Sequence, residues 1–91
     1  MTVAEQFGEN LRRLRRRADL SQEEAAVRAS LHRTEISHLE RGQRIARVDT
    51  VAKLAAALEV DPDEFFAGIE WQPGGIHRGR FRERLSDEGS G

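Results

Sequence analysis

Two short helical patterns, separated by a tight turn, constrain the fold of this chain more than any other feature. The first begins at Ser21, whose hydroxyl can accept a hydrogen bond from the backbone N–H of Glu24. The Glu24 carboxylate can in turn accept one from the backbone N–H of Ser21, which completes a capping box. This signal predicts a helix over residues 22–29, and Ser30 then forms the turn before a second predicted helix over residues 32–41.

The second of these helices has two chemically different faces. On a wheel of about 100° per residue, Ile36, Leu39 and Glu40 share one arc. The opposite arc carries hydrogen-bonding side chains, namely Thr34, Ser37, His38 and Arg41. We therefore expect the first arc to pack inward and the second to face outward, and we expect Gly42 to end the helix in a left-handed conformation.

Further helices are predicted on both sides of this pair. Apolar residues at steps of three and four predict helices over residues 3–19 and 48–58. An aspartate followed by proline predicts a fifth, short helix over residues 62–67. The expected fold class is all-α, with a compact five-helix domain over residues 1–68.

Residues 69–91 form a tail in which glycine and proline interrupt the helical period. Apolar and polar residues alternate there, which predicts two short strands or an extended arm, with residues 86–91 disordered. Its large apolar side chains need a cover, and they are Ile69, Trp71, Phe81 and Leu85. Two covers remain open: the helices of the same chain, or a second protomer that pairs with the tail as a dimerisation arm.

Basic and acidic residues are distributed unevenly along the chain. Residues 1–47 contain ten basic and seven acidic side chains, a net charge of +3, whereas residues 48–91 contain five and nine, a net charge of −4. The first part can therefore offer a basic surface to nucleic acid although the whole chain has a net charge of −1. Without an export signal, a long apolar run or any cysteine, the sequence predicts a cytoplasmic protein with no membrane span and no disulfide.

The sequence contains no recognised catalytic arrangement. His32 and His38 are six residues apart, a spacing that does not place two ligands on one face of a helix. A zinc-protease motif, a nucleophile elbow, a glycine-rich phosphate loop and a zinc-spaced ligand set are all missing from the sequence. We therefore predict that the protein is not an enzyme and uses no metal ion or cofactor.

The stretch LSQEEAAVRASLHRTEISHLERG resembles the Cro and phage-repressor type (XRE-like) of helix-turn-helix regulator. The likeness extends from Phe7 to Phe66 and includes the preceding helix, the LERG ending and the following amphipathic helix. It implies a lambda-repressor-like fold that binds double-stranded DNA in a sequence-specific manner, as a transcriptional regulator and a homodimer. Three positions depart from the family pattern: Ser30 replaces a frequent glycine, Ala25 a frequent leucine, and Arg47 a frequent serine or threonine.

The resemblance also implies a role for individual side chains. With the helix over residues 32–41 in the major groove, the expected base contacts come from Arg33, Thr34, Ser37 and His38. The expected phosphate contacts come from Ser21, Gln22, His32, Arg41, Arg44 and Arg47. The family pattern further pairs Arg15 with Glu40 in a structural ion pair, whereas Arg12, Arg13 and Arg16 are interpreted as solvated.

Three functions from different classes remain open at this point. The first is a transcriptional regulator that binds a two-fold operator as a dimer. The second is an adaptor or antitoxin-like module, in which the same fold mainly binds another protein. The third is a DNA-binding module that acts beside a separate enzyme, as in restriction-control systems. The outward side chains Arg33, Thr34 and His38 favour the first and third functions over the second.

Overall fold

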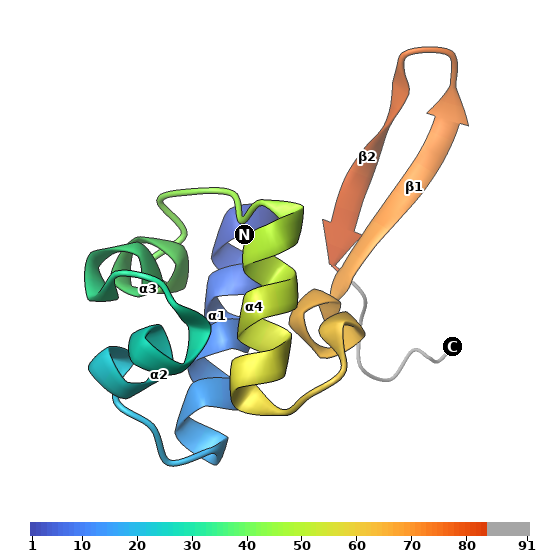
Figure 1. Ribbon diagram of the computed structural model, residues 1–91. Helices are drawn as coiled ribbons and strands as arrows, with labels where there is room; N and C mark the ends of the chain where they lie inside the picture. The colour runs from blue at the N-terminus through green and yellow to red at the C-terminus, as the bar shows by residue number, and fades with distance from the viewer. Residues whose placement is uncertain (84–91) are drawn as a thin grey trace.

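The computed structural model describes residues 1–83, which form a helical domain and a projecting β-hairpin (Figure 1). Within these residues the elements are α1 (Val3–Arg17), α2 (Gln22–Ala29), α3 (Arg33–Glu40), α4 (Val48–Leu58), the 3₁₀ helix η1 (Pro62–Phe66), β1 (Ile69–Gly75) and β2 (Arg78–Glu83). In Figure 1, α2 and α3 lie on one side of α4, and η1 and the hairpin lie on the other. The described helices are all too short or too polar to cross a membrane.

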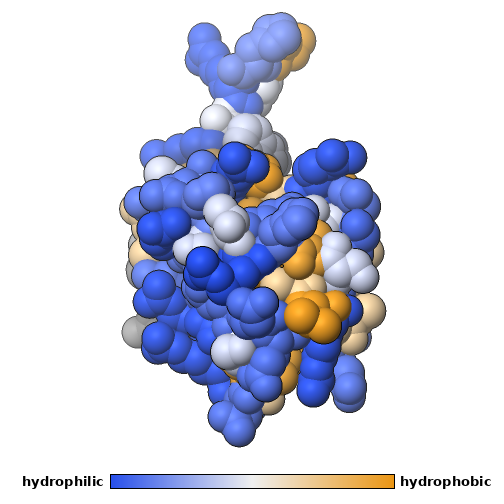
Figure 2. All heavy atoms as spheres, turned by 60° about the vertical axis from the view of Figure 1, so that its left-hand side comes forward, coloured by the Kyte–Doolittle hydropathy of each residue, from blue (hydrophilic) through white to orange (hydrophobic). Residues whose placement is uncertain are grey.

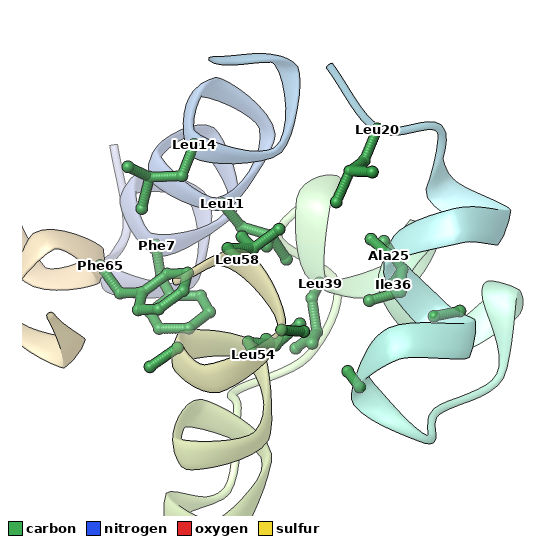
Figure 3. Close-up of a cluster of buried hydrophobic side chains, with 14 residues drawn as sticks. Phe7, Leu11, Leu14, Leu20, Ala25, Ile36, Leu39, Leu54, Leu58 and Phe65 are labelled. Atoms are coloured by element: carbon green, nitrogen blue, oxygen red, sulfur yellow. The ribbon is translucent and has the colours of Figure 1, made fainter. Parts of the chain in front are cut away.

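Buried apolar side chains from all the helices form a shared core (Figure 3). Its largest fully buried members are Leu11, Leu14, Ile36, Leu54 and Phe65. The Phe7 ring of α1 stacks on Phe65 of η1 with a centroid distance of 5.4 Å. Burial of apolar surface at a free-energy gain of about 25 cal/mol per Å² holds the helices together, and thereby fixes where the two ends of α3 lie.

The helix ends differ from the prediction at α1 and α3. We predicted the first helix over residues 3–19, but it ends at Arg17 because Asp19 adopts a left-handed conformation with φ of 60°. The predicted helix over residues 32–41 is shorter by one residue at each end. His32 has an extended backbone and forms the N-cap of α3, without a capping hydrogen bond from its side chain.

The prediction of a fifth α-helix over residues 62–67 is wrong, because this segment is the 3₁₀ helix η1. The Glu64 N–H donates to the Asp61 carbonyl at 3.0 Å, a step of three residues. The Asp61 side chain makes no capping bond, and Gly68 turns the chain away with φ of 81°. The segment is therefore too short to build the four-residue hydrogen-bond ladder of an α-helix.

A buried asparagine, which the sequence analysis did not single out, fixes the point at which the chain leaves η1. The side-chain amide of Asn10 donates to the carbonyls of Phe65 and Ala67, each at 2.8 Å. Its oxygen accepts a hydrogen bond from Gln6 at 3.2 Å. Carbonyls at a helix end lack helical partners, so Asn10 supplies the missing donors and attaches the root of the hairpin to α1.

Of the two predicted backbone alternatives, two short strands or an extended arm, the tail adopts the strands: β1 and β2 pair as an antiparallel hairpin. Trp71 lies opposite Phe81, and Glu70 lies opposite Arg82. The hairpin projects away from the helical domain (Figure 1), so residues 1–83 leave much of the Trp71 and Phe81 side chains uncovered. Leu85 and the predicted disordered end over residues 86–91 lie outside the described residues.

Close contact between α1 and α3 depends on Gly8. A Cβ atom added to Gly8 would lie 2.7 Å from the backbone oxygen of Glu40, and it would also collide with the Leu39 carbonyl. We expect Gly8→Ala to lower the free energy of unfolding by about 1–2 kcal/mol, because overpacking costs more than the better helix propensity of alanine returns. Urea denaturation followed by circular dichroism measures this loss.

The matched control for Gly8→Ala is Glu9→Ala, which changes an exposed neighbour on the same helix. This control should change the free energy of unfolding by no more than about 0.5 kcal/mol. If Gly8→Ala proved as stable as the control, α1 and α3 would have room to separate, and the close approach would not constrain α3.

Candidate nucleic-acid interface

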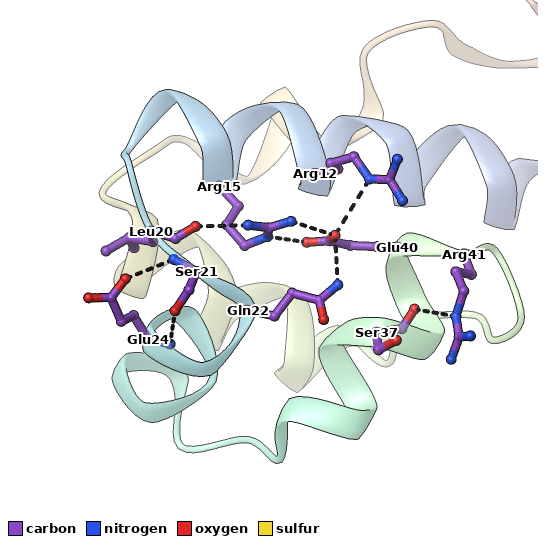
Figure 4. A network of polar contacts seen from close by, with 9 residues as sticks. All are labelled: Arg12, Arg15, Leu20, Ser21, Gln22, Glu24, Ser37, Glu40 and Arg41. Carbon is purple, nitrogen blue, oxygen red and sulfur yellow. Dashed lines mark hydrogen bonds and ion pairs between the residues drawn. The ribbon is translucent and has the colours of Figure 1, made fainter.

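A buried ion pair attaches the inner side of α3 to α1. The guanidinium of Arg15 on α1 donates two hydrogen bonds to the Glu40 carboxylate on α3, from Nε to Oε2 and from NH2 to Oε1, the latter at 2.9 Å (Figure 4). The Glu40 side chain is fully buried and that of Arg15 is 10% exposed. Hydrogen bonding to Glu40 raises the pKa of Arg15. The family resemblance implied this pair, and the contact accounts for an acidic residue on the inner arc of α3.

Glu40 also receives contacts from two side chains that the sequence analysis assigned elsewhere. The Gln22 amide on α2 donates to Glu40 Oε1 at 3.1 Å. The Arg12 Nε atom lies 3.7 Å from the same oxygen (Figure 4). One carboxylate therefore connects α1, α2 and α3, and it fixes the N-terminus of α2 relative to α3.

The N-terminus of α2 is formed by the capping box at Ser21. The Ser21 hydroxyl accepts from the Glu24 N–H at 3.0 Å, and the Ser21 N–H donates to the Glu24 carboxylate at 2.8 Å. This backbone hydrogen bond lowers the pKa of Glu24. Because a hydroxyl both accepts and donates, Ser21 retains its own proton for another acceptor. The first turn of α2 can thus present donors to an anion.

The turn between α2 and α3 contains the serine that stands where the family pattern has glycine. Ser30 adopts a left-handed conformation with φ of 56° and ψ of 43°, which glycine adopts without strain. The Leu31 N–H donates to the Ala26 carbonyl at 2.9 Å and closes the turn. Ala25, Ala26 and Ala29 are buried in α2, so small side chains let α3 pack closely against it.

The two faces of α3 differ in exposure. Ile36 and Leu39 are buried in the core on its inner side. Arg33 and Thr34 are exposed at its N-terminal end, and Ser37 and His38 are half-buried. Arg33 Nε lies 3.9 Å from Glu23 Oε1, and both side chains are exposed, so solvent screens this pair and Arg33 is free to change partner.

Three exposed arginines follow α3 and lead into α4. The Arg41 Nε atom donates to the Ser37 carbonyl at 3.3 Å, and Arg47 Nε lies 3.4 Å from Asp49 Oδ1. Arg44 is exposed in the loop between them. Arg47 occupies the N-cap of α4 without a side-chain capping bond, as expected where arginine replaces serine or threonine. The Arg47 side chain stays largely exposed beside Asp49.

The view that brings the α2 and α3 side forward shows a surface made mostly of hydrophilic side chains (Figure 2). Among residues 1–83, no group of three or more His, Cys, Asp or Glu side chains is placed to hold a metal ion. This side offers hydrogen-bond donors and arginines, beside the exposed carboxylates of Glu23 and Glu24. Such a surface suits a polyanion better than it suits a small-molecule substrate.

Comparison with known families identifies this arrangement. A family model described as a helix-turn-helix domain matches residues 6–65, nearly the whole helical part of the chain. The chain belongs to the helix-turn-helix family. Within it, α2 and α3 are the two helices after which the family is named, and Ser30 lies in the turn between them.

Relatives of this helix-turn-helix protein include named regulators. Control protein C.BamHI of Bacillus amyloliquefaciens is 41% identical over 59 residues, covering 64% of this chain and 73% of that protein. An uncharacterized HTH-type transcriptional regulator, y4dJ of Sinorhizobium fredii, is 37% identical over 75 residues, covering 82% and 97%. The crystal structure of the restriction-modification controller protein C.AhdI from Aeromonas hydrophila superposes with a TM-score of 0.68 at 41% identity, covering 69% of this chain and 96% of that one.

The helix-turn-helix geometry brings most of the sequence-predicted site residues to one region, but sequence reasoning missed two contacts. It assigned Gln22 to phosphate, whereas the Gln22 amide nitrogen has an acceptor inside the protein. It interpreted Arg12 as solvated, whereas Arg12 lies beside Glu40. A signal was present, because a buried carboxylate accepts about four hydrogen bonds and one arginine supplies two of them. Glu40 therefore had room for further donors.

Proposed function

We propose that this protein binds double-stranded DNA in a sequence-specific manner and regulates transcription, with α3 in the major groove. One observation carries the proposal. The inner arc of α3 is held by a buried ion pair, while its exposed N-terminal end presents hydrogen-bonding side chains to solvent. A rigidly mounted helix with outward donors is what base recognition in the major groove requires.

We divide the candidate DNA-contacting side chains into base contacts and phosphate contacts. We assign base contacts to Arg33, Thr34, Ser37 and His38. We assign phosphate contacts to Ser21, Gln22, His32, Arg41, Arg44 and Arg47. Arg33 suits guanine, because a guanidinium can donate two hydrogen bonds to O6 and N7. The Thr34 methyl group suits the methyl group of thymine.

Gln22 can serve both the protein and the duplex. Its amide nitrogen carries two protons, and one of them is used by Glu40 at 3.1 Å. The second proton can donate to a phosphate oxygen beside the N-terminus of α2. Gln22 would then couple the position of the DNA backbone to the buried carboxylate behind α3.

Two copies of the chain would bind one operator. In the proposed arrangement residues 1–68 form the DNA-binding domain and residues 69–91 provide the dimer contact through Ile69, Trp71, Phe81 and Leu85. A two-fold dimer places its two reading helices about 34 Å apart, one helical turn of DNA. The protein would act where its DNA target is, in the cytoplasm, and none of its assigned roles is catalytic.

A second candidate is suggested by what the relatives are called. C.BamHI is named a control protein, and C.AhdI is named a restriction-modification controller protein. Regulation of a restriction-modification system is therefore the more specific version of the same proposal. It differs from general transcriptional regulation in the genes beside the operator, not in the chemistry of α3.

Selection from random duplex DNA with the purified full chain tests the proposal. We expect a two-fold preferred site, bound at least about 1,000-fold more tightly than a scrambled duplex in fluorescence anisotropy at the same salt concentration. Equal, salt-sensitive binding to every duplex would contradict sequence-specific recognition. Binding to no duplex would instead favour the adaptor or antitoxin-like function.

A further inference from the structure

Exposed large apolar side chains gather on segments that meet near the start of α1. Among the exposed large apolar side chains of residues 1–83, Val27 on α2 lies elsewhere. The others are Met1, Ile45, Val48, Phe66, Trp71, Ile76 and Phe81. They come from the N-terminus, the loop before α4, the first residue of α4, η1 and the hairpin. So many exposed apolar side chains on adjoining segments indicate a surface that another molecule covers.

Part of this surface is an open groove between α1, α4 and η1. Its apolar lining includes Val3, Phe7, Ile45, Val51 and Phe66. A second hollow, lined by Met1, Val3, Ile69 and Phe81 among others, adjoins the first at Val3 and leads to the base of the hairpin. The groove and the hairpin are thus parts of one continuous surface.

The hairpin has an apolar face that the same chain covers only at its base, as far as residues 1–83 show. Trp71 and Phe81 pack edge to face with a centroid distance of 5.0 Å, yet they remain 50% and 54% exposed. Ile76, in the turn at the tip, is 85% exposed. A two-stranded hairpin is marginally stable in water without further cover, so this face needs an occupant.

The opposite face of the hairpin is polar and already paired. Arg82 Nε donates to Glu70 at 3.1 Å, and Arg80 Nε donates to Gln72 at 3.4 Å. These pairs are exposed and can stay in water when the other face is covered. The hairpin is therefore amphipathic, and its polarity determines which face turns toward an occupant.

We propose that two copies of the chain exchange hairpins, so that the tip of each hairpin, at Ile76, lies in the groove beside Ile45 and Phe66 of its partner. Val48 is three residues from both Ile45 and Val51, which line this groove, and its exposed side chain marks the groove's edge. The inference deepens the proposed function, from which it takes the two-fold dimer. A second copy is the fitting occupant because it brings the same hairpin and the same groove. Each contact then occurs twice around the two-fold axis.

The exposed area matches what a stable dimer needs. A large side chain that is about half exposed or more leaves on the order of 100 Å² of surface uncovered. Seven such side chains on each of two copies therefore offer about 1,400 Å². Stable protein interfaces bury about 1,200–2,000 Å², so the exposed apolar area is large enough to form one.

Disulfide trapping tests the exchange directly, because the natural sequence has no cysteine. A full-length Ile76→Cys chain is mixed under reducing conditions with a Val48→Cys chain, and the mixture is then oxidised. We expect a covalent dimer of twice 10.3 kDa in the mixture, well above the level in either chain alone. A disulfide needs Cα atoms within about 7 Å, so it reports contact between the hairpin of one copy and the groove of the other.

In the matched control, the Ile76→Cys chain is mixed with a Val27→Cys chain instead of the Val48→Cys chain. Val27 is an exposed valine on α2, away from the groove. This mixture should form no more covalent dimer than the unmixed chains. Equal cross-linking in the Val48 and Val27 mixtures would overturn the proposal. Since each variant changes one exposed side chain, all of them should keep the wild-type circular dichroism spectrum.

Light scattering with Ile76→Glu and Val48→Glu gives a second readout. We expect each substitution to weaken the dimer at least about 10-fold, because it places a charge in the apolar contact. If Ile76→Glu alone weakened it, the hairpins would pair with each other and the groove would not be the acceptor. If the mass were unchanged while DNA binding lost salt dependence, the hairpin would contact DNA. Either result would overturn the exchange.

The test separates this inference from the proposed function. A preferred site found by DNA selection, together with no specific disulfide, would leave the function standing and remove the exchange. A specific disulfide without any preferred DNA site would support the hairpin exchange and contradict the proposed function.

Discussion

Replacing Glu40 with alanine is expected to lower the free energy of unfolding by about 3–5 kcal/mol. The substitution leaves the Arg15 guanidinium buried without an acidic partner, and the Leu20 carbonyl is then its remaining acceptor. A buried charge that has lost its counter-ion costs several kcal/mol to keep from water. Small domains have a total stability of about 5–15 kcal/mol, so chemical denaturation at 25 °C should show a large loss.

Two comparisons isolate the cause of the Glu40→Ala effect. The double variant Arg15→Met, Glu40→Leu removes both charges and should be more stable than Glu40→Ala alone. Glu64→Ala removes the acid from the exposed Arg17–Glu64 pair, whose atoms lie 3.1 Å apart, and should cost no more than about 1 kcal/mol. A loss of that small size in Glu40→Ala would show that water screens the Arg15–Glu40 pair.

Replacing Arg33 with alanine is expected to weaken binding to the preferred DNA site about 5- to 150-fold, which corresponds to about 1–3 kcal/mol of lost base recognition. Binding to an unrelated duplex should change much less, because phosphate contacts supply that affinity. Fluorescence anisotropy at a fixed salt concentration measures both. Arg33 is exposed, so stability should change by no more than about 0.5 kcal/mol.

The matched control for Arg33→Ala is Arg44→Ala, an exposed arginine in the loop after α3. We expect it to weaken binding to all duplexes about equally and to reduce the salt dependence by about one unit of slope. If Arg33→Ala behaved in the same way, Arg33 would be a phosphate contact, and base recognition would fall to Thr34, Ser37 and His38.

Features that depend on residues close in sequence could be predicted. The capping box joins Ser21 to Glu24, three residues away, so the start of α2 can be read from four letters. The alternation of the tail likewise predicts strands, although the choice between strands and an extended arm stayed open. Both signals arise from local backbone geometry, which neighbouring side chains determine.

Features that depend on distant residues could not be predicted from residue types alone. Asn10 donates to carbonyls 55 and 57 residues away, and nothing in its own neighbourhood distinguishes it from a solvated asparagine. Gly8 lies in a helix where glycine is unfavourable, and its reason is the backbone of α3. The Arg15–Glu40 pair was expected through the family resemblance, since an acid on an inner arc calls for a partner but does not name it.

The fifth helix shows where a local signal reaches its limit. The aspartate and proline correctly mark a helical start at Pro62, and they carry no information on how long the segment continues. Its length is set by Gly68 and by the Asn10 side chain, which binds the Phe65 and Ala67 carbonyls. The result is a short 3₁₀ segment whose end is fixed by α1.

Within residues 1–83, the buried side chains that hold α3 in place lie on its inner arc, at Ile36, Leu39 and Glu40. The exposed side chains of Arg33 and Thr34 contribute little to this packing, so single substitutions there leave the scaffold intact. In the proposed binding mode, descendants of such a chain can acquire new operators one residue at a time without passing through an unfolded intermediate. Because the residues that hold α3 differ from the exposed residues at its outer face, the same domain can serve for several regulators that each bind a different DNA site.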